Sequence, residues 1–119
     1  MYHSFEDLDV WKKACRLATD TYTALKECRD YGLKDQMTRA AVSVASNIAE
    51  GAERDSKAEF ARFMHIAKGS AAELRTQLYI ATRLGVIPAP RAQELVEETK
   101  HIAAMLQNLT AKVHVKPKT

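Results

Sequence analysis

The sequence is poor in glycine and proline, which interrupt regular structure, and in cysteine, which can cross-link a fold. Its 119 residues include four glycines and three prolines, which argues against long disordered segments and against a turn-rich all-β fold. The only cysteines, Cys15 and Cys28, form no CxxC motif. We therefore expect two reduced, buried or half-buried thiols, with no zinc knuckle and no disulfide framework.

Long apolar runs are also missing. No stretch approaches the roughly 20 residues that cross a bilayer, and the N-terminus carries Glu6 and Asp7 where a signal peptide would have a basic and then an apolar region. We therefore expect a cytoplasmic protein with no membrane partner.

Motifs for catalysis and cofactor binding are nearly absent. The sequence has no glycine-rich phosphate loop, no GxSxG and no HExxH. Glu98 and His101 have the spacing of a di-iron bundle, but such a site needs two of these pairs and two further inward-facing glutamates. We expect no enzyme, no cofactor and no metal site.

The charge that is present is unevenly distributed. Eighteen basic and 15 acidic residues give a net charge of +3, and residues 56–85 hold five basic but only two acidic side chains. A modest basic excess of this kind is compatible with a nucleic-acid partner but does not by itself establish one.

Four segments have apolar residues at helical spacing, with short connections between them. They cover about 7–28, 34–50, 56–84 and the stretch after Pro90 up to 113. This pattern predicts an all-α, antiparallel up-down-up-down four-helix bundle. We expect one domain over 1–119, in which 113–119 is a flexible basic tail.

Each segment has its own predicted apolar stripe. The stripes are, in chain order, Leu8, Trp11, Cys15, Ala18, Tyr22 and Leu25; Met37, Ala40, Ala41, Val44 and Ile48; Phe60, Phe63, Ala67, Ala71, Leu74, Leu78 and Ala81; and Leu95, Ile102, Met105, Leu106, Leu109 and Val113.

Residues typical of helix caps and helix ends predict where the helices begin and end. The Ser56-x-x-Glu59 pattern is a capping box, and Pro90 suits a first helical turn. We expect Gly85 to end the third helix, Gly51 to end the second, and Gly32 to cap the first in a left-handed conformation.

The second segment carries a regular polar stripe beside its apolar one. On a helical wheel its residues lie about 60° to 140° from Val44; they are Gln36, Arg39, Ser43, Asn47, Glu50 and Arg54. A solvated helix face, an ordered polar seam between helices or subunits, and a ligand site are all compatible with this pattern. Since Asn and Ser are poor helix formers, paired contacts would explain their presence.

The third segment sorts its charges by face. Lys57, Lys68 and Arg75 fall within about 20° of one another on a helical wheel, with His65 and Arg83 about 60° away. The stripe is either a solvated face that pairs with acids of other helices or a row that follows a phosphate backbone. The candidate nucleic-acid contacts are Lys57, Lys68, Arg75, Arg83, Lys112, Lys116 and Lys118.

Several stretches occur in an order that resembles a known family. They are Phe5-Glu-Asp-Leu-Asp-Val-Trp11, Gly32-Leu-Lys-Asp-Gln-Met-Thr-Arg39, Ala41-Val-Ser-Val-Ala-Ser-Asn-Ile-Ala-Glu-Gly51 and Ile66-Ala-Lys-Gly-Ser-Ala-Ala-Glu-Leu74. The chain resembles the four-helix-bundle proteins encoded in intervening sequences of 23S ribosomal RNA genes. That family includes the accessory variability protein of diversity-generating retroelements.

The resemblance implies a homo-oligomeric ring, typically a homopentamer. Retroelement relatives bind nucleic acid and a reverse transcriptase through a basic surface, whereas most members have no assigned activity. The family motif falls on residues that we interpret as an assembly or structural seam: Gln36, Arg39, Ser43, Asn47, Glu50, Gly51, Arg54, Gly69, Ser70 and Glu73. In this interpretation Gly69 and Ser70 allow the second and third helices to approach closely.

The leading hypothesis is a non-enzymatic scaffold or adaptor that forms a ring and binds RNA or DNA. The alternative is a protein-interaction module that docks a partner protein and has no nucleic-acid role. Salt-sensitive binding of nucleic acid distinguishes the two.

Overall fold

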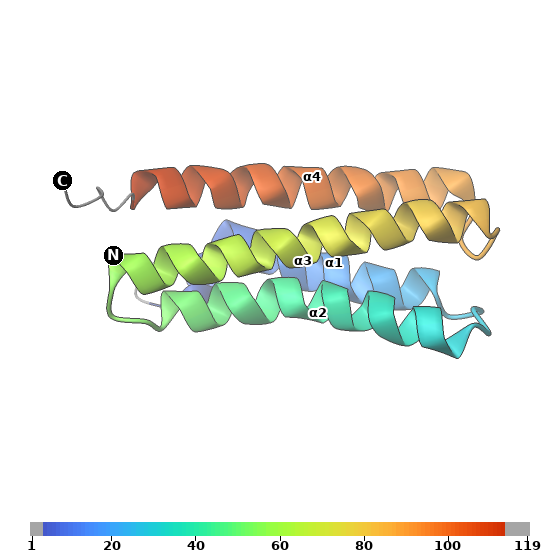
Figure 1. Ribbon diagram of the computed structural model, residues 1–119, viewed down its shortest axis with the longest axis horizontal. Coiled ribbons are helices and arrows are strands. Elements are labelled where there is room, and N and C mark those ends of the chain that lie inside the picture. The colour runs from blue at the N-terminus through green and yellow to red at the C-terminus, as the bar shows by residue number, and fades with distance from the viewer. Residues whose placement is uncertain (1–3, 114–119) are drawn as a thin grey trace.

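The structure, a computed structural model, describes residues 4–113 and contains one short 3₁₀ helix and four α-helices. Each α-helix runs opposite to the one before it (Figure 1), so the predicted all-α up-down-up-down bundle is confirmed. Contacts join α1 to α2, α2 to α3, α3 to α4 and α4 back to α1. The elements are η1 (Phe5–Asp7), α1 (Asp9–Ala24), α2 (Tyr31–Ala52), α3 (Lys57–Arg83) and α4 (Ala89–Lys112).

The predicted apolar stripes of α2 and α3 form the centre of the core. Every residue of both stripes is buried, and α3 packs extensively against both α2 and α4. In α4 the stripe is buried at Leu95, Ile102 and Leu106 and half-buried at Met105 and Leu109. Burial of such stripes is the main stabilising term of a bundle.

The predicted stripe of the first helical segment is correct at Leu8, Ala18 and Leu25, which are buried, but wrong at its other three residues. Tyr22 is 53% exposed, and Trp11 and Cys15 are only half-buried. The buried face instead consists of Val10, Ala14, Leu17, Ala18 and Thr21. Both sets have steps of three and four, so periodicity alone did not separate them. Trp11 and Cys15 lie at the edge of the core, where Phe5 packs edge-on against Trp11.

Two predicted helix ends are also wrong. Gly32 does not cap α1, which ends at Ala24, but lies in the first turn of α2, where the Asp30 carboxylate accepts a hydrogen bond from the Leu33 amide at 3.1 Å. Gly51 does not end α2, because the helix continues to Ala52. Asp30 is an ordinary N-cap residue, and it explains why α2 begins three residues earlier than expected.

The boundaries of α3 and α4 follow their predicted signals. Ser56 Oγ accepts a hydrogen bond from the Glu59 amide at 3.0 Å, and Gly85, directly after the C-cap of α3, has φ +72°. Pro90 lies in the first turn of α4. Within residues 4–113, no helix is both long and apolar enough to cross a membrane.

Candidate nucleic-acid interface and polar seam

A small polar network lies between α2 and α3. The Ser43 and Ser70 hydroxyl oxygens are 2.9 Å apart, and Asn47 Nδ2 donates to both the carbonyl oxygen and Oγ of Ser43, at 2.8 and 2.9 Å. All three residues are half-buried. The network therefore bridges the two helices and satisfies polar groups that burial would otherwise penalise.

The other α2 residues of the polar stripe point to solvent. Arg39 pairs with Asp35 at 2.9 Å, and Arg54 pairs with Glu50 at 2.9 Å. Gln36 is exposed. Within the expected seam, side-chain hydrogen bonds thus join Ser43, Asn47 and Ser70 across the two helices, whereas Glu50 and Arg54 pair with each other on α2. The exposed ion pairs add little stability, since such pairs contribute about 0–1 kcal/mol.

The close approach of α2 to α3 occurs at Gly51, whereas the sequence analysis predicted it at Gly69. A Cβ atom at Gly51 would lie 2.6 Å from Phe63 Cβ and 2.7 Å from Met64 Cε. A Cβ atom at Gly69 would meet nothing within 4 Å, and the residue is exposed. The interpretation of Gly69 as a packing residue is therefore wrong, because it faces away from the α2 contact.

Around Gly51, two arginines enclose a buried ring. The guanidinium carbon of Arg54 lies 4.9 Å from the Phe63 ring centroid and that of Arg62 lies 4.5 Å from it. Arg62 also pairs with Glu59 at 2.9 Å, and this hydrogen bond lowers the pKa of the Glu59 carboxyl. These cations are consequently engaged by groups of the same chain.

Exposed apolar residues lie on the same side of α3 as Ser70, spread along the helix. On a helical wheel Ile66 and Leu84 lie about 40° from Ser70, and Ile80 lies about 80° from it; their exposed fractions are 39%, 61% and 45%. Glu73 is exposed, and Gln77 is buried, with its Oε1 lacking a hydrogen-bond partner among residues 4–113. Glu73 lies between Ile66 and Ile80 on the same wheel. We call the surface formed by Ser43, Asn47, Ile66, Ser70, Glu73, Ile80 and Leu84 the α2–α3 face.

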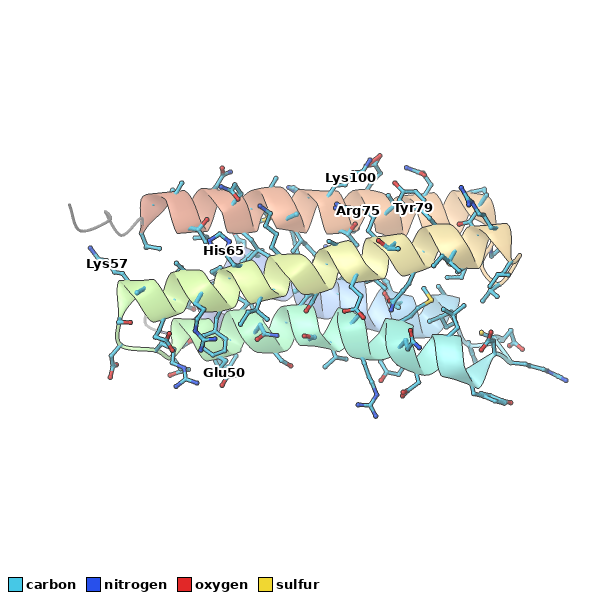
Figure 2. The ribbon with its side chains drawn as sticks, in the orientation of Figure 1. Glu50, Lys57, His65, Arg75, Tyr79 and Lys100 are labelled. Carbon is cyan, nitrogen blue, oxygen red and sulfur yellow. The ribbon has the colours of Figure 1, made fainter. Side chains whose placement is uncertain are left out.

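The opposite flank of α3 is basic. Lys68 Nζ donates to Gln107 Oε1 of α4 at 2.6 Å, which fixes this flank against α4. Arg75 follows Lys68 by seven residues on α3, and Lys100 precedes Gln107 by seven residues on α4. Because the two helices are antiparallel, Arg75 and Lys100 lie at the same level of the bundle. Figure 2 shows Arg75 on α3 beside Lys100 on α4, and it shows Glu50 on the α2 side of the bundle.

None of these cations is ion-paired with a carboxylate in the described part of the chain. On a helical wheel of α4 Glu97 lies about 60° around from Lys100, toward the back of the helix, and accepts a hydrogen bond from Gln93 at 3.3 Å. We call this surface the α3–α4 face; it contains Lys57, His65, Lys68, Arg75, Tyr79, Arg83, Lys100 and Gln107.

Lys112 lies apart from the other predicted contacts. It belongs to a separate hollow between the start of α1 and the end of α4, together with Asp7 and Asp9. The proposed basic row therefore does not continue through Lys112. Lys116 and Lys118, and the predicted tail from 114 onward, lie outside the described residues.

Sequence reasoning missed Lys100 and Gln107 as parts of the basic surface. Their positions on α4 become meaningful only once the register between α3 and α4 is known. No cluster of three or more potential metal ligands occurs within residues 4–113. Glu98 is half-buried and His101 is exposed, whereas Cys15 and Cys28 are both free thiols.

The chain matches several solved structures and one family model. A crystal structure of a protein with unknown function from the S23 ribosomal protein family of Bacteroides thetaiotaomicron superposes with a TM-score of 0.80. The match covers 85% of this chain and 97% of the other, at 21% sequence identity. No curated protein matches the sequence.

The family model described as 23S rRNA-intervening sequence protein matches residues 6–108. The match spans all four helices except the last residues of α4. The chain therefore belongs to the 23S rRNA-intervening sequence protein family.

Proposed function

We propose that this protein is a non-enzymatic cytoplasmic scaffold that assembles with copies of itself and binds RNA or DNA through the α3–α4 face. The observation that carries the proposal is the row of cations on this face that have no carboxylate partner among residues 4–113. Five subunits in a closed ring is the assembly that the family resemblance implies.

The length of the row suits a polyanion. Lys57 and Arg83 are 26 positions apart on α3, which corresponds to about 39 Å along the helix axis. A nucleic-acid strand carries one phosphate about every 3.4 Å in a duplex, so several phosphates fit along this length. Repetition of the row around an oligomer would multiply a modest charge into a large binding surface.

The α2–α3 face is better suited to contact with a second copy of the chain. Its exposed apolar residues are Ile66, Ile80 and Leu84. The neighbouring arginines of α2 are paired with acids, so two subunits would meet there without repulsion between cations. The α3–α4 face, in contrast, would repel a second copy of itself.

A ring also needs two different complementary surfaces on each subunit. A second set of exposed large apolar side chains occurs on α1 and α2, at Tyr22, Tyr31 and Val42. We propose that this set of one subunit contacts the α2–α3 face of the next. Aromatic residues such as tyrosine are enriched in interface centres.

The alternative function is the docking of a partner protein without nucleic acid. The exposed apolar residues of the α2–α3 face favour it, because they could equally contact a helix of another protein. This alternative predicts no salt-sensitive affinity for RNA or DNA.

The test is size-exclusion chromatography with light scattering, with and without a short mixed-sequence RNA, at low and moderate salt. A mass near five chains that rises with RNA at low salt supports the proposal. An oligomer that ignores RNA at both salt concentrations favours the docking alternative. A monomer contradicts the assembly part of the proposal.

A further inference from the structure

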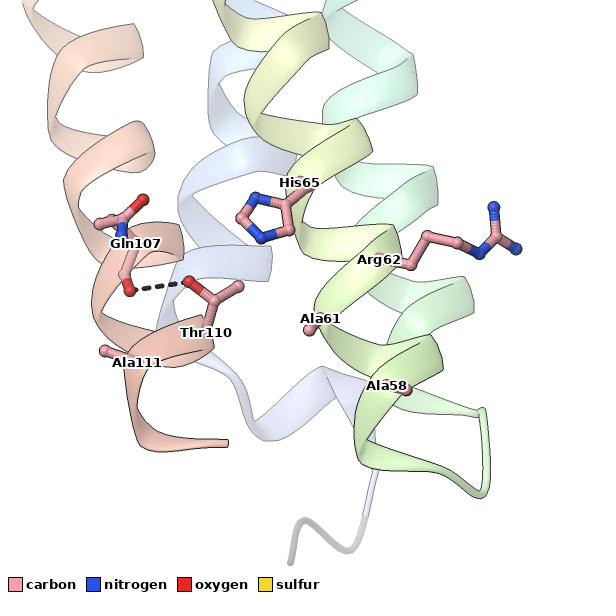
Figure 3. Close-up of a pocket in the computed structure, with 7 residues that line it drawn as sticks. All are labelled: Ala58, Ala61, Arg62, His65, Gln107, Thr110 and Ala111. Atoms are coloured by element: carbon pink, nitrogen blue, oxygen red, sulfur yellow. Dashed lines mark hydrogen bonds between the residues drawn. The ribbon is translucent and has the colours of Figure 1, made fainter. Parts of the chain in front are cut away.

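A hollow of about 860 Å³ lies at one end of the α3–α4 face (Figure 3). Its volume is within the range of about 300–1,000 Å³ that is usual for sites of small organic molecules. It is formed by the first turns of α3 and the last turns of α4. The residues that line it are Ala58, Ala61, Arg62, His65, Gln107, Thr110 and Ala111.

The hollow exists because methyl groups occupy positions that larger side chains would fill. Ala58 and Ala111 are exposed, and Ala61 is half-buried. Together they provide a shallow apolar floor between the two helices. Such a floor can contact the flat face of a ring without a loss of hydrogen bonds.

Polar groups border this floor. The His65 ring lies between α3 and α4 on the wall of the hollow (Figure 3). Gln107 Oε1 is engaged by Lys68, but Gln107 Nε2 donates to no group within residues 4–113. Thr110 Oγ1 donates to the Gln107 carbonyl at 2.9 Å, which leaves its lone pairs free to accept. The site thus offers a stacking surface, a donor and an acceptor.

The charge around the hollow favours an anionic ligand. Lys57 and Lys68 lie on the same flank of α3 as Ala61, and Lys68 reaches Gln107. The Arg62 guanidinium turns away from the hollow (Figure 3) and pairs with Glu59. The other hollow, about 380 Å³ in volume, carries Asp7 and Asp9 and is therefore unfavourable for a polyanion.

We propose that this hollow receives the base of an unpaired nucleotide, while the cations of the α3–α4 face hold the phosphates on either side. This inference rests on the proposed function, because it names the kind of nucleic acid that the basic surface selects. A base in a duplex is stacked on its neighbours and cannot enter the hollow, whereas a base in a single strand can turn out and stack on a histidine ring. The protein then prefers single-stranded RNA or DNA to a duplex.

The test compares three probes: a fluorescent 12-nucleotide oligoadenylate, an RNA duplex with the same number of phosphates, and inorganic polyphosphate of matched length. We expect the single strand to bind about tenfold more tightly than the other two, the effect of about one stacked base. Polyphosphate reports the phosphate contacts alone, since it has no bases.

Two variants on α4 test whether the preference for the single strand arises in the hollow. Ala111→Leu fills the hollow, and Ala104→Leu adds the same group seven residues earlier, at an exposed position outside it. Ala111→Leu should remove the tenfold preference and leave polyphosphate binding unchanged, while Ala104→Leu should leave both unchanged. His65→Ala, which removes the stacking ring without filling the hollow, should also reduce the preference.

The outcomes separate the two proposals. Equal affinity for all three probes, or a preference that survives in both Ala111→Leu and His65→Ala, overturns the base-binding hollow but leaves the basic surface in place. Failure of all three probes to bind at low salt overturns the proposed nucleic-acid function, and the hollow proposal falls with it.

Discussion

The two flanks of α3 differ in which of their exposed side chains lack a partner. On the α2–α3 face the nearby arginines are paired with acids, and three large apolar side chains remain exposed. On the α3–α4 face the cations lack carboxylate partners within residues 4–113, and Tyr79 is the one large apolar side chain that is markedly exposed. A surface with exposed apolar side chains and paired arginines is suited to protein contact, and a surface with unpaired cations is suited to phosphate contact, so one helix can serve two partners.

The largest expected effect is on folding and tests where α2 and α3 approach. Gly51→Ala places a methyl group within 2.6 Å of Phe63 Cβ, so one helix must shift. Overpacking of this kind costs about 1–3 kcal/mol. Thermal unfolding followed by circular dichroism should show a clearly lower Tm.

Gly69→Ala is the matched control for that substitution. Its new methyl group meets nothing within 4 Å, and alanine exceeds glycine in helix propensity by about 1 kcal/mol. The Tm should therefore rise. A lower Tm for Gly69→Ala than for Gly51→Ala would contradict the assignment of the close approach to Gly51.

The next effect concerns assembly and sharpens the contrast between the flanks. Ile66→Lys introduces a charge beside Ser70, on the face proposed to contact a second subunit. We expect subunit association to weaken by at least tenfold, because burying an unpaired cation at an interface is costly. Light scattering across a dilution series measures it.

Tyr79→Lys is the control on the other flank of α3. Tyr79 is 47% exposed and Ile66 is 39% exposed, so both variants replace an exposed apolar residue of the same helix. Tyr79→Lys should keep the mass of the parent protein. Dissociation by Tyr79→Lys alone would reverse the assignment of the two faces.

A smaller effect is expected on nucleic-acid affinity. The double variant Lys68→Ala/Arg75→Ala removes two phosphate contacts, so the slope of log affinity against log salt should fall by about 1.4–1.8. Fluorescence anisotropy at several salt concentrations measures that slope. Lys12→Ala/Lys26→Ala, which removes two exposed charges elsewhere, should keep it. Equal slopes for both double variants would remove the α3–α4 face from consideration.

The smallest effect is expected within the α2–α3 face. Asn47→Leu removes two hydrogen bonds to Ser43 and should lower the free energy of unfolding by about 1 kcal/mol.

Gln77→Leu removes a buried Oε1 that has no partner among residues 4–113, so this substitution should leave the free energy of unfolding unchanged or raise it. Urea unfolding of both variants measures the difference. The same stability and mass for Asn47→Leu as for the parent would refute the structural role of the polar network.

Sequence reasoning was most successful where one stripe dominated. In α2 and α3 the apolar residues have a single consistent rotation, and all of those predicted are buried. In α1 two stripes competed, and the one with Trp11 and Tyr22 was favoured although the smaller residues around Leu17 face the core. Size and hydrophobicity did not reveal which set the neighbouring helices could accommodate.

The candidate site was only partly predictable for a related reason. Lys57, Lys68 and Arg75 could be grouped because they lie on one helix, where angular positions follow from numbering. Lys100 and Gln107 could not be added, since their place depends on the register between α3 and α4. The sequence assigned the close approach to Gly69, because the packing of Phe63 against Gly51 depends on how α2 and α3 meet.

The most direct test of the division between the two flanks is lysine acetylation footprinting of the parent protein with and without single-stranded RNA. Lys57, Lys68 and Lys100 report on the α3–α4 face, and the exposed Lys12 and Lys26 report on the rest of the surface. RNA should reduce the acetylation of the first three several-fold and leave the other two unchanged. Equal protection of both groups, or protection of Lys12 and Lys26 alone, would contradict the assignment of nucleic-acid binding to the α3–α4 face.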